Sequence, residues 1–241
     1  MSSIYIIVII SILGSIIGSF IGVIKKPSET FMYNMLSFAA GVMLSLSFMN
    51  LIPMGIKLSS KSVCLLGILL GGLIMYIVDR LIPHIHPGLN EQEQGKSLQR
   101  TSTLLILGMC VHHFPEGMAI AIGSTTDIKI SIAVALAIAI HDIPEGICTS
   151  APYYAYTNNK LKTFFISSLT AIPTLLGFFV SYYLYKFIPI STVGLIMGIT
   201  AGLMIYICTD ELIPSSSFKL TNHSTIFSFL IGTVLVMAFS L

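Results

Sequence analysis

Charged side chains are scarce in this 241-residue chain, which contains 12 Lys and Arg and 10 Asp and Glu, or 9% of its residues. A soluble domain has about 25%. So few charges could not cover the surface of a soluble protein of this length, and 55% of the residues are hydrophobic. The composition therefore excludes an ordinary soluble enzyme and indicates that the protein is embedded in a lipid bilayer.

Basic clusters and paired cysteines are also missing. No segment has the four or more Lys and Arg that nucleic acids or anionic lipid surfaces require, so we expect no nucleic-acid partner. The cysteines lie in apolar segments without CxxC spacing, which argues against a disulfide framework and favours small apolar roles over redox or metal chemistry. These cysteines are Cys64, Cys110, Cys148 and Cys208.

The apolar residues are grouped into runs of near-spanning length, separated by short polar breaks. A membrane-spanning helix needs about 20 residues. The runs cover residues 3–24, 31–56, 62–82, 101–124, 127–150, 161–187, 191–213 and 224–241. We therefore predict an all-α polytopic membrane protein with eight transmembrane helices in a single domain, residues 1–241. The first run has no cleavage motif, so we interpret it as a retained span.

The cations predict the orientation, because cytoplasmic loops of membrane proteins are enriched in Lys and Arg. Placing both termini outside puts most of the cations in cytoplasmic loops. The cytoplasmic set is then Lys25, Lys26, Arg80, Lys96, Arg100, Lys160, Lys162 and Lys219, and the outer set is Lys57, Lys61, Lys129 and Lys186. The bias predicts an N-out, C-out topology and a cytoplasmic, histidine-bearing loop at residues 84–100.

Two nearly identical segments stand out within consecutive runs: HHFPEG at residues 112–117 and HDIPEG at residues 141–146. Each ionisable residue inside a span costs about 2.5 to 3.5 kcal/mol on insertion scales, so the two segments need a compensating partner. Both lie near mid-span, and consecutive spans run antiparallel. We therefore expect the segments to face each other at the bilayer midplane and to hold a cation, with kinks at Pro115 and Pro144.

Helical spacing divides the donors of these segments into two sets. Residues four apart share a helix face, so each segment presents one histidine and one glutamate together. Imidazole nitrogen and carboxylate oxygen suit zinc, and less selectively iron, manganese, cobalt and cadmium. The predicted primary ligands are His112, Glu116, His141 and Glu145, while His113 and Asp142, about 100° around each helix, are candidates for an adjoining second site. A polar network that only joins the two helices is the alternative.

On these residues the chain resembles the ZIP (Zrt/Irt-like) family of metal transporters, especially its ZupT-like bacterial branch. The resemblance covers nearly the whole chain, including eight spans, outward termini, the histidine-bearing loop and the two motifs. It implies that the motif residues above line the transport site. It also implies that Met43, in the segment GVMLS at 41–45, reaches the primary metal and that Asn50 marks a polar entrance. For Met43, plain packing is the alternative.

The resemblance further implies a cytoplasmic release path. Its candidate residues are Asp79, His84, His86, Asp210 and Glu211. Simpler interpretations stay open: the two histidines are solvated loop residues, and the last two acids form an interfacial cap or a bridge to Arg80. One position departs from the family, because Ile172 stands before Pro173 where members commonly have a glutamate. The second site therefore lacks one expected carboxylate.

The resulting hypothesis is a multi-pass transporter of the plasma membrane that imports zinc into the cytoplasm by alternating access. The other candidate cargoes are Fe²⁺, Mn²⁺, Co²⁺ and Cd²⁺; zinc is cargo rather than cofactor. The resemblance implies that spans one, four, five and six move as a unit against the other four. Oligomeric state stays open, with a homodimer as one candidate. The alternatives are an intramembrane metal-dependent hydrolase, disfavoured because neither motif reads HExxH, and a metal-sensing receptor.

Overall fold

The computed structural model describes residues 2–24, 28–81, 106, 109–110, 113–114, 116–124, 128–184, 187, 189–217 and 223–240. Its elements within these ranges are all helices, as predicted. They are α1 (Ser2–Ile24), α2 (Glu29–Leu46), α3 (Ile52–Leu58), α4 (Lys61–Leu81), α6 (Ile128–Thr157), α7 (Lys160–Ser168), α8 (Ile172–Leu184), α9 (Ile190–Ile207), α10 (Ile213–Ser217) and α11 (Ser224–Ser240).

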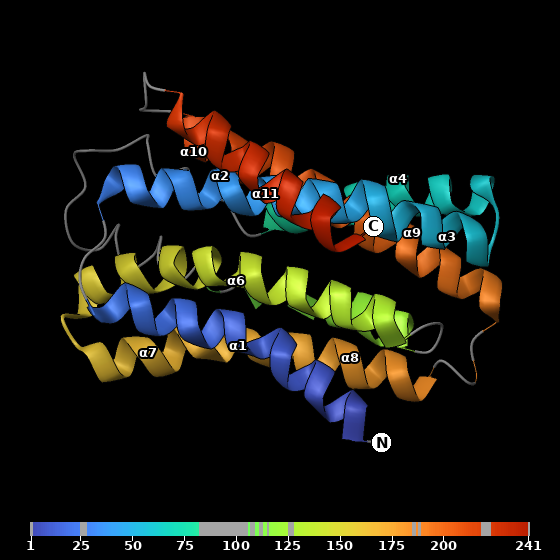
Figure 1. Ribbon diagram of the computed structural model, residues 1–241, viewed down its shortest axis with the longest axis horizontal. Coiled ribbons are helices and arrows are strands. Elements are labelled where there is room, and N and C mark those ends of the chain that lie inside the picture. The colour runs from blue at the N-terminus through green and yellow to red at the C-terminus, as the bar shows by residue number, and fades with distance from the viewer. Residues whose placement is uncertain are drawn as a thin grey trace.

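Six helical segments are long and apolar enough to cross a bilayer. They are Ile6–Ile24, Tyr33–Leu58, Lys61–Arg80, Val134–Ala151, Lys160–Leu184 and Ile190–Asp210, and Ser224–Ala238 forms a shorter apolar helix. The predicted fourth span is described only in part, with residues 116–124 helical. Both ends of the described chain point toward the same end of the long axis (Figure 1), which an even number of spans requires. The count of eight and the outward orientation stay predictions.

Short irregular turns divide three of the predicted spans just before a proline. A π-helical turn at Ser47–Leu51 joins α2 to α3 ahead of Pro53, and another at Cys208–Leu212 joins α9 to α10 ahead of Pro214. A 3₁₀ turn at Leu169–Ala171 joins α7 to α8 ahead of Pro173. Proline removes a backbone donor and crowds the preceding turn, so the helix adjusts there. Helix α6, by contrast, continues through Pro144.

The helices form two groups, which occupy separate layers in Figure 1. The motif bundle, defined here as α1, residues 113–114 and 116–124, α6, α7 and α8, contains the described residues of both duplicated segments. The flanking bundle consists of α2, α3, α4, α9, α10 and α11. Among the described helices, α6 packs against α2 and α11, which connects the two bundles. The predicted division into spans one, four, five and six and the remaining four spans matches these layers.

Glycine allows close helix contacts inside each bundle. In the motif bundle, Gly14 and Gly18 of α1 lie directly against the backbone of α6. In the flanking bundle, Gly71 of α4 does the same against α9, and Gly41 of α2 against α11. For every described glycine with a neighbour at its Cβ position, the nearest atoms belong to its own bundle. Because small residues let helix backbones approach in a membrane, these seams make each bundle a tightly packed unit.

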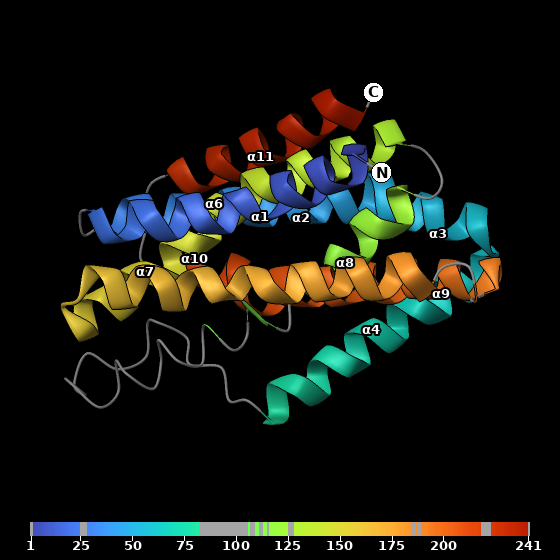
Figure 2. The same cartoon turned by 90° about the horizontal axis from the view of Figure 1, so that it is seen from below.

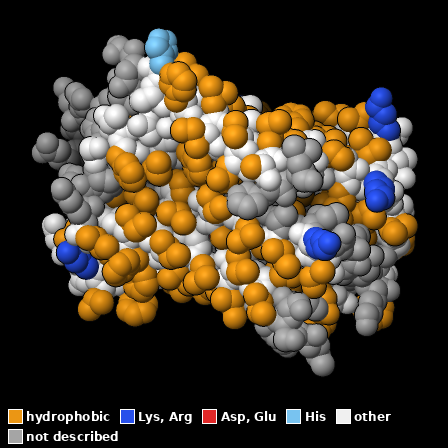
Figure 3. All heavy atoms as spheres, viewed as in Figure 1, with side chains coloured by type: hydrophobic (Ala, Val, Ile, Leu, Met, Phe, Trp, Pro, Cys, Tyr) orange, Lys and Arg blue, Asp and Glu red, His pale blue; other side chains and the backbone are white. Residues whose placement is uncertain are grey.

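Hydrophobic side chains are spread over the whole face seen in Figure 3, and the few Lys and Arg side chains lie toward the two ends of the long axis. Helix α4, whose far end diverges from the other helices in Figure 2, exposes a row of apolar side chains that includes Leu65, Leu69 and Leu73. In water such a surface would drive aggregation. The exposed apolar surface is suited to contact with lipid acyl chains, which supports the prediction of a membrane protein.

Candidate metal centre

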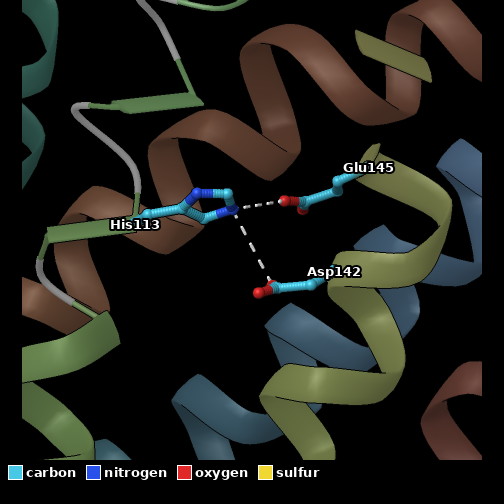
Figure 4. A group of neighbouring side chains, drawn as sticks. All are labelled: His113, Asp142 and Glu145. Atoms are coloured by element: carbon cyan, nitrogen blue, oxygen red, sulfur yellow. Dashed lines mark ion pairs between the residues drawn. The ribbon is translucent and has the colours of Figure 1, made fainter. Parts of the chain in front are cut away.

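Helix α6 provides three ionisable side chains in slightly more than one turn. His141 and Asp142 are 0% exposed, and Glu145 is 2% exposed. One helical turn separates Asp142 from Glu145, so both carboxylates project from the same side of the helix (Figure 4). The His141 imidazole and the two carboxylates together form the α6 half of the site.

The fourth predicted span supplies the opposing half through His113, which is 1% exposed, and Glu116, which is 0% exposed. Two close contacts with α8 hold this segment in place: Gly117 lies against the carbonyl of Thr174, and Gly177 against the carbonyl of Phe114. Because neither glycine has a side chain, the segment and α8 approach backbone to backbone. This contact fixes how far His113 and Glu116 reach toward α6.

The first group of donors joins Glu116, His141 and Asp142, whose ligand atoms all lie within 4.8 Å of one another. His141 Nε2 is 2.9 Å from Glu116 Oε1 and 3.4 Å from Asp142 Oδ1. One atom from each of three side chains therefore surrounds a common point. A cation entering this point would displace the hydrogen bond between His141 and Glu116.

The second group joins His113, Asp142 and Glu145, again with ligand atoms within 4.8 Å of one another. His113 points from its span toward both α6 carboxylates (Figure 4). Its Nε2 is 3.5 Å from Glu145 Oε2 and 3.8 Å from Asp142 Oδ1. Asp142 thus belongs to both groups, and its Oδ1 lies between the two imidazoles.

Backbone carbonyls fix the orientation of both imidazole rings. His113 Nδ1 is 2.6 Å from the carbonyl oxygen of Thr170, and His141 Nδ1 is 3.0 Å from that of Ala137. A carbonyl only accepts, so each Nδ1 must donate its proton. Both rings therefore direct Nε2 at the carboxylates. Metal-binding histidines in proteins are held in the same way.

These separations match the size of a small, closely coordinated cation. Zinc–ligand distances of about 2.1 Å give donor-to-donor edges of about 3.4 Å in a tetrahedral set. Three of the four imidazole-to-carboxylate distances, 3.4, 3.5 and 3.8 Å, are close to that edge, and the fourth, the hydrogen bond of 2.9 Å between His141 and Glu116, is shorter. Zinc or an ion of similar size would therefore need His141 and Glu116 to separate slightly, while the other pairs are already suitably spaced.

Charge balance points to the same ligand class. Three carboxylates and two imidazoles are almost completely buried within one cluster. Burying like charges together is expensive unless an opposite charge accompanies them. A divalent cation would compensate most of this negative charge. A network of hydrogen bonds that only joined helices would not need so many carboxylates in one place.

Several predicted residues lie apart from this cluster or outside the description. His112, His84 and His86 are not among the described residues, and the side chain of Glu211 is not described. Met43 is fully buried in the apolar core, and Asn50 is half-buried in the π-helical turn of the second span. Their roles stay predictions.

Two of the three acids predicted for a release path lie close to Tyr206 in the flanking bundle. Asp79 of α4 and Asp210 of the second π-helical turn both act electrostatically on Tyr206 of α9. The guanidinium of Arg80 stacks over the ring of Tyr76, 5.2 Å from its centroid. For Asp210, the interfacial alternative stays open beside the release path.

Ile172, the departure from the family pattern, does not point toward the buried cluster. It is 45% exposed, whereas Thr170 and Thr174 of the same turn are 1% exposed. Through its carbonyl, Thr170 instead holds His113 beside Asp142 and Glu145. The second donor group thus forms without a carboxylate from this span.

Sequence reasoning missed two residues around the cluster. Thr170 orients His113 through its backbone, which no residue pattern reveals. Ser15 of α1 donates a hydrogen bond to Asp142 Oδ2 at 2.9 Å. A signal for Ser15 was present, because Ser11, Ser15 and Ser19 recur every four residues in an otherwise apolar run.

Comparison with known proteins identifies the family. The family model described as ZIP Zinc transporter matches residues 86–240, well over half of the chain. The chain belongs to the ZIP family. Two relatives described as "Zinc transporter ZupT" agree with this. The one from Escherichia coli O7:K1 (strain IAI39 / ExPEC) is 33% identical, and the one from Escherichia coli O127:H6 (strain E2348/69 / EPEC) is 34% identical. Each match spans 233 residues, 93% of this ZIP chain and 90% of the relative.

Proposed function

We propose that this ZIP protein imports zinc, and other divalent transition metals less selectively, across the plasma membrane into the cytoplasm. The observation that supports this most is the buried, Asp142-centred cluster within an apolar helical protein. Zinc is the cargo. Family membership and the relatives' descriptions as zinc transporters favour transport over the hydrolase and receptor alternatives.

The cargo would be held by the two donor groups and by His112, which the sequence adds to them. Glu116, His141 and Asp142 form one half, and His113, Asp142 and Glu145 the other. With Asp142 common to both, one ion can bind centrally or two can share this carboxylate. Nitrogen and oxygen donors suit zinc, and also iron, manganese, cobalt and cadmium.

Alternating access requires the site to be exposed to one side of the membrane at a time. Every buried ionisable residue of the cluster belongs to the motif bundle, and the glycine seams lie inside the bundles rather than between them. The surface where α2 and α11 meet α6 is therefore the natural plane of movement. In this proposal the motif bundle carries the ion past the flanking bundle.

Zinc uptake into proteoliposomes tests the proposal. Glu116→Gln and Glu145→Gln keep side-chain shape but remove the charge, so we expect uptake in each to fall to near background. Ser37→Ala is the control, because it removes a buried hydroxyl of the flanking bundle that binds only the Thr225 carbonyl. Near wild-type uptake in both glutamine variants would contradict the site assignment.

A second arm measures the cargo range and separates transport from sensing. Added Fe²⁺, Mn²⁺, Co²⁺ or Cd²⁺ should compete with zinc and reduce its flux, because the same donors bind these ions. A receptor would bind zinc tightly and show no flux into vesicles. Binding without flux would therefore favour the sensing alternative over import.

A further inference from the structure

The two oxygens of Asp142 have different surroundings. Oδ1 faces the imidazoles of His113 and His141 at 3.8 and 3.4 Å. Oδ2 accepts a hydrogen bond of 2.9 Å from Ser15 of α1. One oxygen is thus directed at the donor groups and the other is held away from them by a different helix.

Ser15 is well placed to fix the carboxylate. Its side chain is 1% exposed, so water does not compete for the hydrogen bond. The neighbouring serines on the same helix face behave differently: Ser11 donates to the Val8 carbonyl of its own helix, and Ser19 Oγ has no hydrogen-bond partner among the described residues. The link from α1 to the cluster is therefore specific to Ser15.

The backbone around Ser15 is held rigidly against α6. A Cβ atom added at Gly14 would lie 2.8 Å from Asp142 Cβ, and one added at Gly146 would lie 2.7 Å from the Ser15 carbonyl oxygen. Only glycine fits at both places. Because α1 and α6 are fixed in register there, the Ser15 hydroxyl has little freedom to leave Asp142.

We propose that Ser15 is a positioning residue that makes Asp142 a one-oxygen ligand, so that Oδ1 alone is offered to the cargo ion. This inference rests on the proposed function of the cluster. A carboxylate held in this way suits the low coordination number of zinc, whereas a freely rotating carboxylate can bind an ion through both oxygens, as larger ions tolerate.

Metal binding by the full-length protein in lipid nanodiscs tests the inference. The variants are Ser15→Ala, Ser11→Ala and Ser19→Ala, each made also in an Asp142→Ala background. Loss of an outer hydrogen-bond partner lowers metal affinity about 10- to 100-fold. We expect a zinc Kd at least about tenfold higher for Ser15→Ala, and little change for the two control variants.

Two further readouts separate positioning from a general structural role. In the Asp142→Ala background, Ser15→Ala should have no additional effect on zinc affinity, because its partner is already absent. The visible absorption of bound Co²⁺, which reports coordination geometry, should change in Ser15→Ala and remain unchanged in Ser11→Ala. Ser15→Thr retains the hydroxyl donor, and should keep a zinc Kd near that of the wild type.

Three results would overturn the inference: an unchanged zinc Kd in Ser15→Ala, an equal loss in Ser11→Ala or Ser19→Ala, or an undiminished Ser15→Ala effect without Asp142. If Ser15→Ala does not fold, the same criteria apply to Ser15→Gly, which also removes the hydroxyl. Failure of the proposed function appears separately, as wild-type protein that binds zinc in nanodiscs but moves none into proteoliposomes.

Discussion

The motif bundle and the flanking bundle have similar helix packing, but they bury different kinds of side chain. Both are closed by glycine contacts between helices, such as Gly18 with α6 and Gly71 with α9. Among described residues, however, the buried Asp, Glu and His side chains all lie in the motif bundle. Since the flanking bundle packs without them, the charged cluster is not needed to join helices. The difference indicates that the cluster serves the cargo.

The hydroxyls of the motif bundle include one that binds a buried carboxylate on another helix. Hydroxyls of the flanking bundle mostly bind their own helix, as Ser45 does to Gly41 and Thr200 does to Ile196. Hydroxyls of the motif bundle also mostly bind their own helix, as Thr149 and Ser150 do, but Ser15 donates to the carboxylate of Asp142 on another helix. Inter-helix polar contacts of this kind hold the donors in position.

The largest expected effect is the loss of Asp142, the residue common to both donor groups. Asp142→Ala should reduce zinc uptake and zinc affinity by more than about 100-fold, which exceeds the usual cost of losing an outer partner. Asp79→Ala in the flanking bundle should slow uptake by about tenfold or less and keep the affinity. Initial uptake rates and binding titrations measure both. Equal losses in the two variants would remove the distinction between the bundles.

A covalent link between the bundles should stop transport without stopping binding. With the native cysteines replaced, a cysteine on α2 cross-linked to the facing turn of α6 should abolish zinc uptake and leave the zinc Kd nearly unchanged. The control joins α2 to α11 within one bundle, at Ser37→Cys and Thr225→Cys, where the native residues are hydrogen-bonded. Uptake that survives the α2–α6 link would exclude relative movement of the bundles.

Replacing a glycine at a helix contact with a larger residue should lower the free energy of unfolding by a similar amount in both bundles. A valine at Gly18 or Gly71 would meet the backbone of a facing helix, and such overpacking costs about 1–3 kcal/mol or more. Gly72 is the matched control, because nothing lies within 4 Å of its Cβ position. Gly72→Ala should be neutral or stabilise by up to about 1 kcal/mol. Thermal unfolding in detergent measures these changes. Unchanged stability after Gly18→Val or Gly71→Val would show that glycine is not required at that helix contact.

The smallest expected effect is at Met43, which belongs to the flanking bundle but is predicted to reach the metal. Met43→Leu conserves volume, so the free energy of unfolding should change by less than about 1.5 kcal/mol. Thioether sulfur prefers soft ions, so cadmium affinity should fall a few-fold more than zinc affinity. Competition binding with both ions provides the comparison. Identical ratios in variant and wild type would reduce Met43 to a packing residue.

The sequence predicted the helical runs well because lipid imposes a simple length requirement on apolar segments. It also predicted that Glu116 and His141 belong to the site, since each lies in a duplicated polar block. Spacing along one helix cannot reveal the rotation of two helices relative to each other. For that reason it separated Asp142 from the primary donors, whereas the structure places it in both groups.

Contacts between distant segments were beyond the reach of the sequence. Ser15 and Asp142 are 127 residues apart, and His113 and Thr170 are 57 apart. Neither pairing follows from local periodicity. The irregular turns before Pro53 and Pro214 were also not predicted, because proline permits several local adjustments of a helix and packing decides among them.

The most direct test is an anomalous-scattering map from crystals grown or soaked with zinc. The account predicts density within about 2.0–2.2 Å of Asp142 Oδ1, with His141 and Glu116 or His113 and Glu145 completing the coordination. Zinc bound only elsewhere, for example at Asp79 and Asp210 with none beside Asp142, would contradict it.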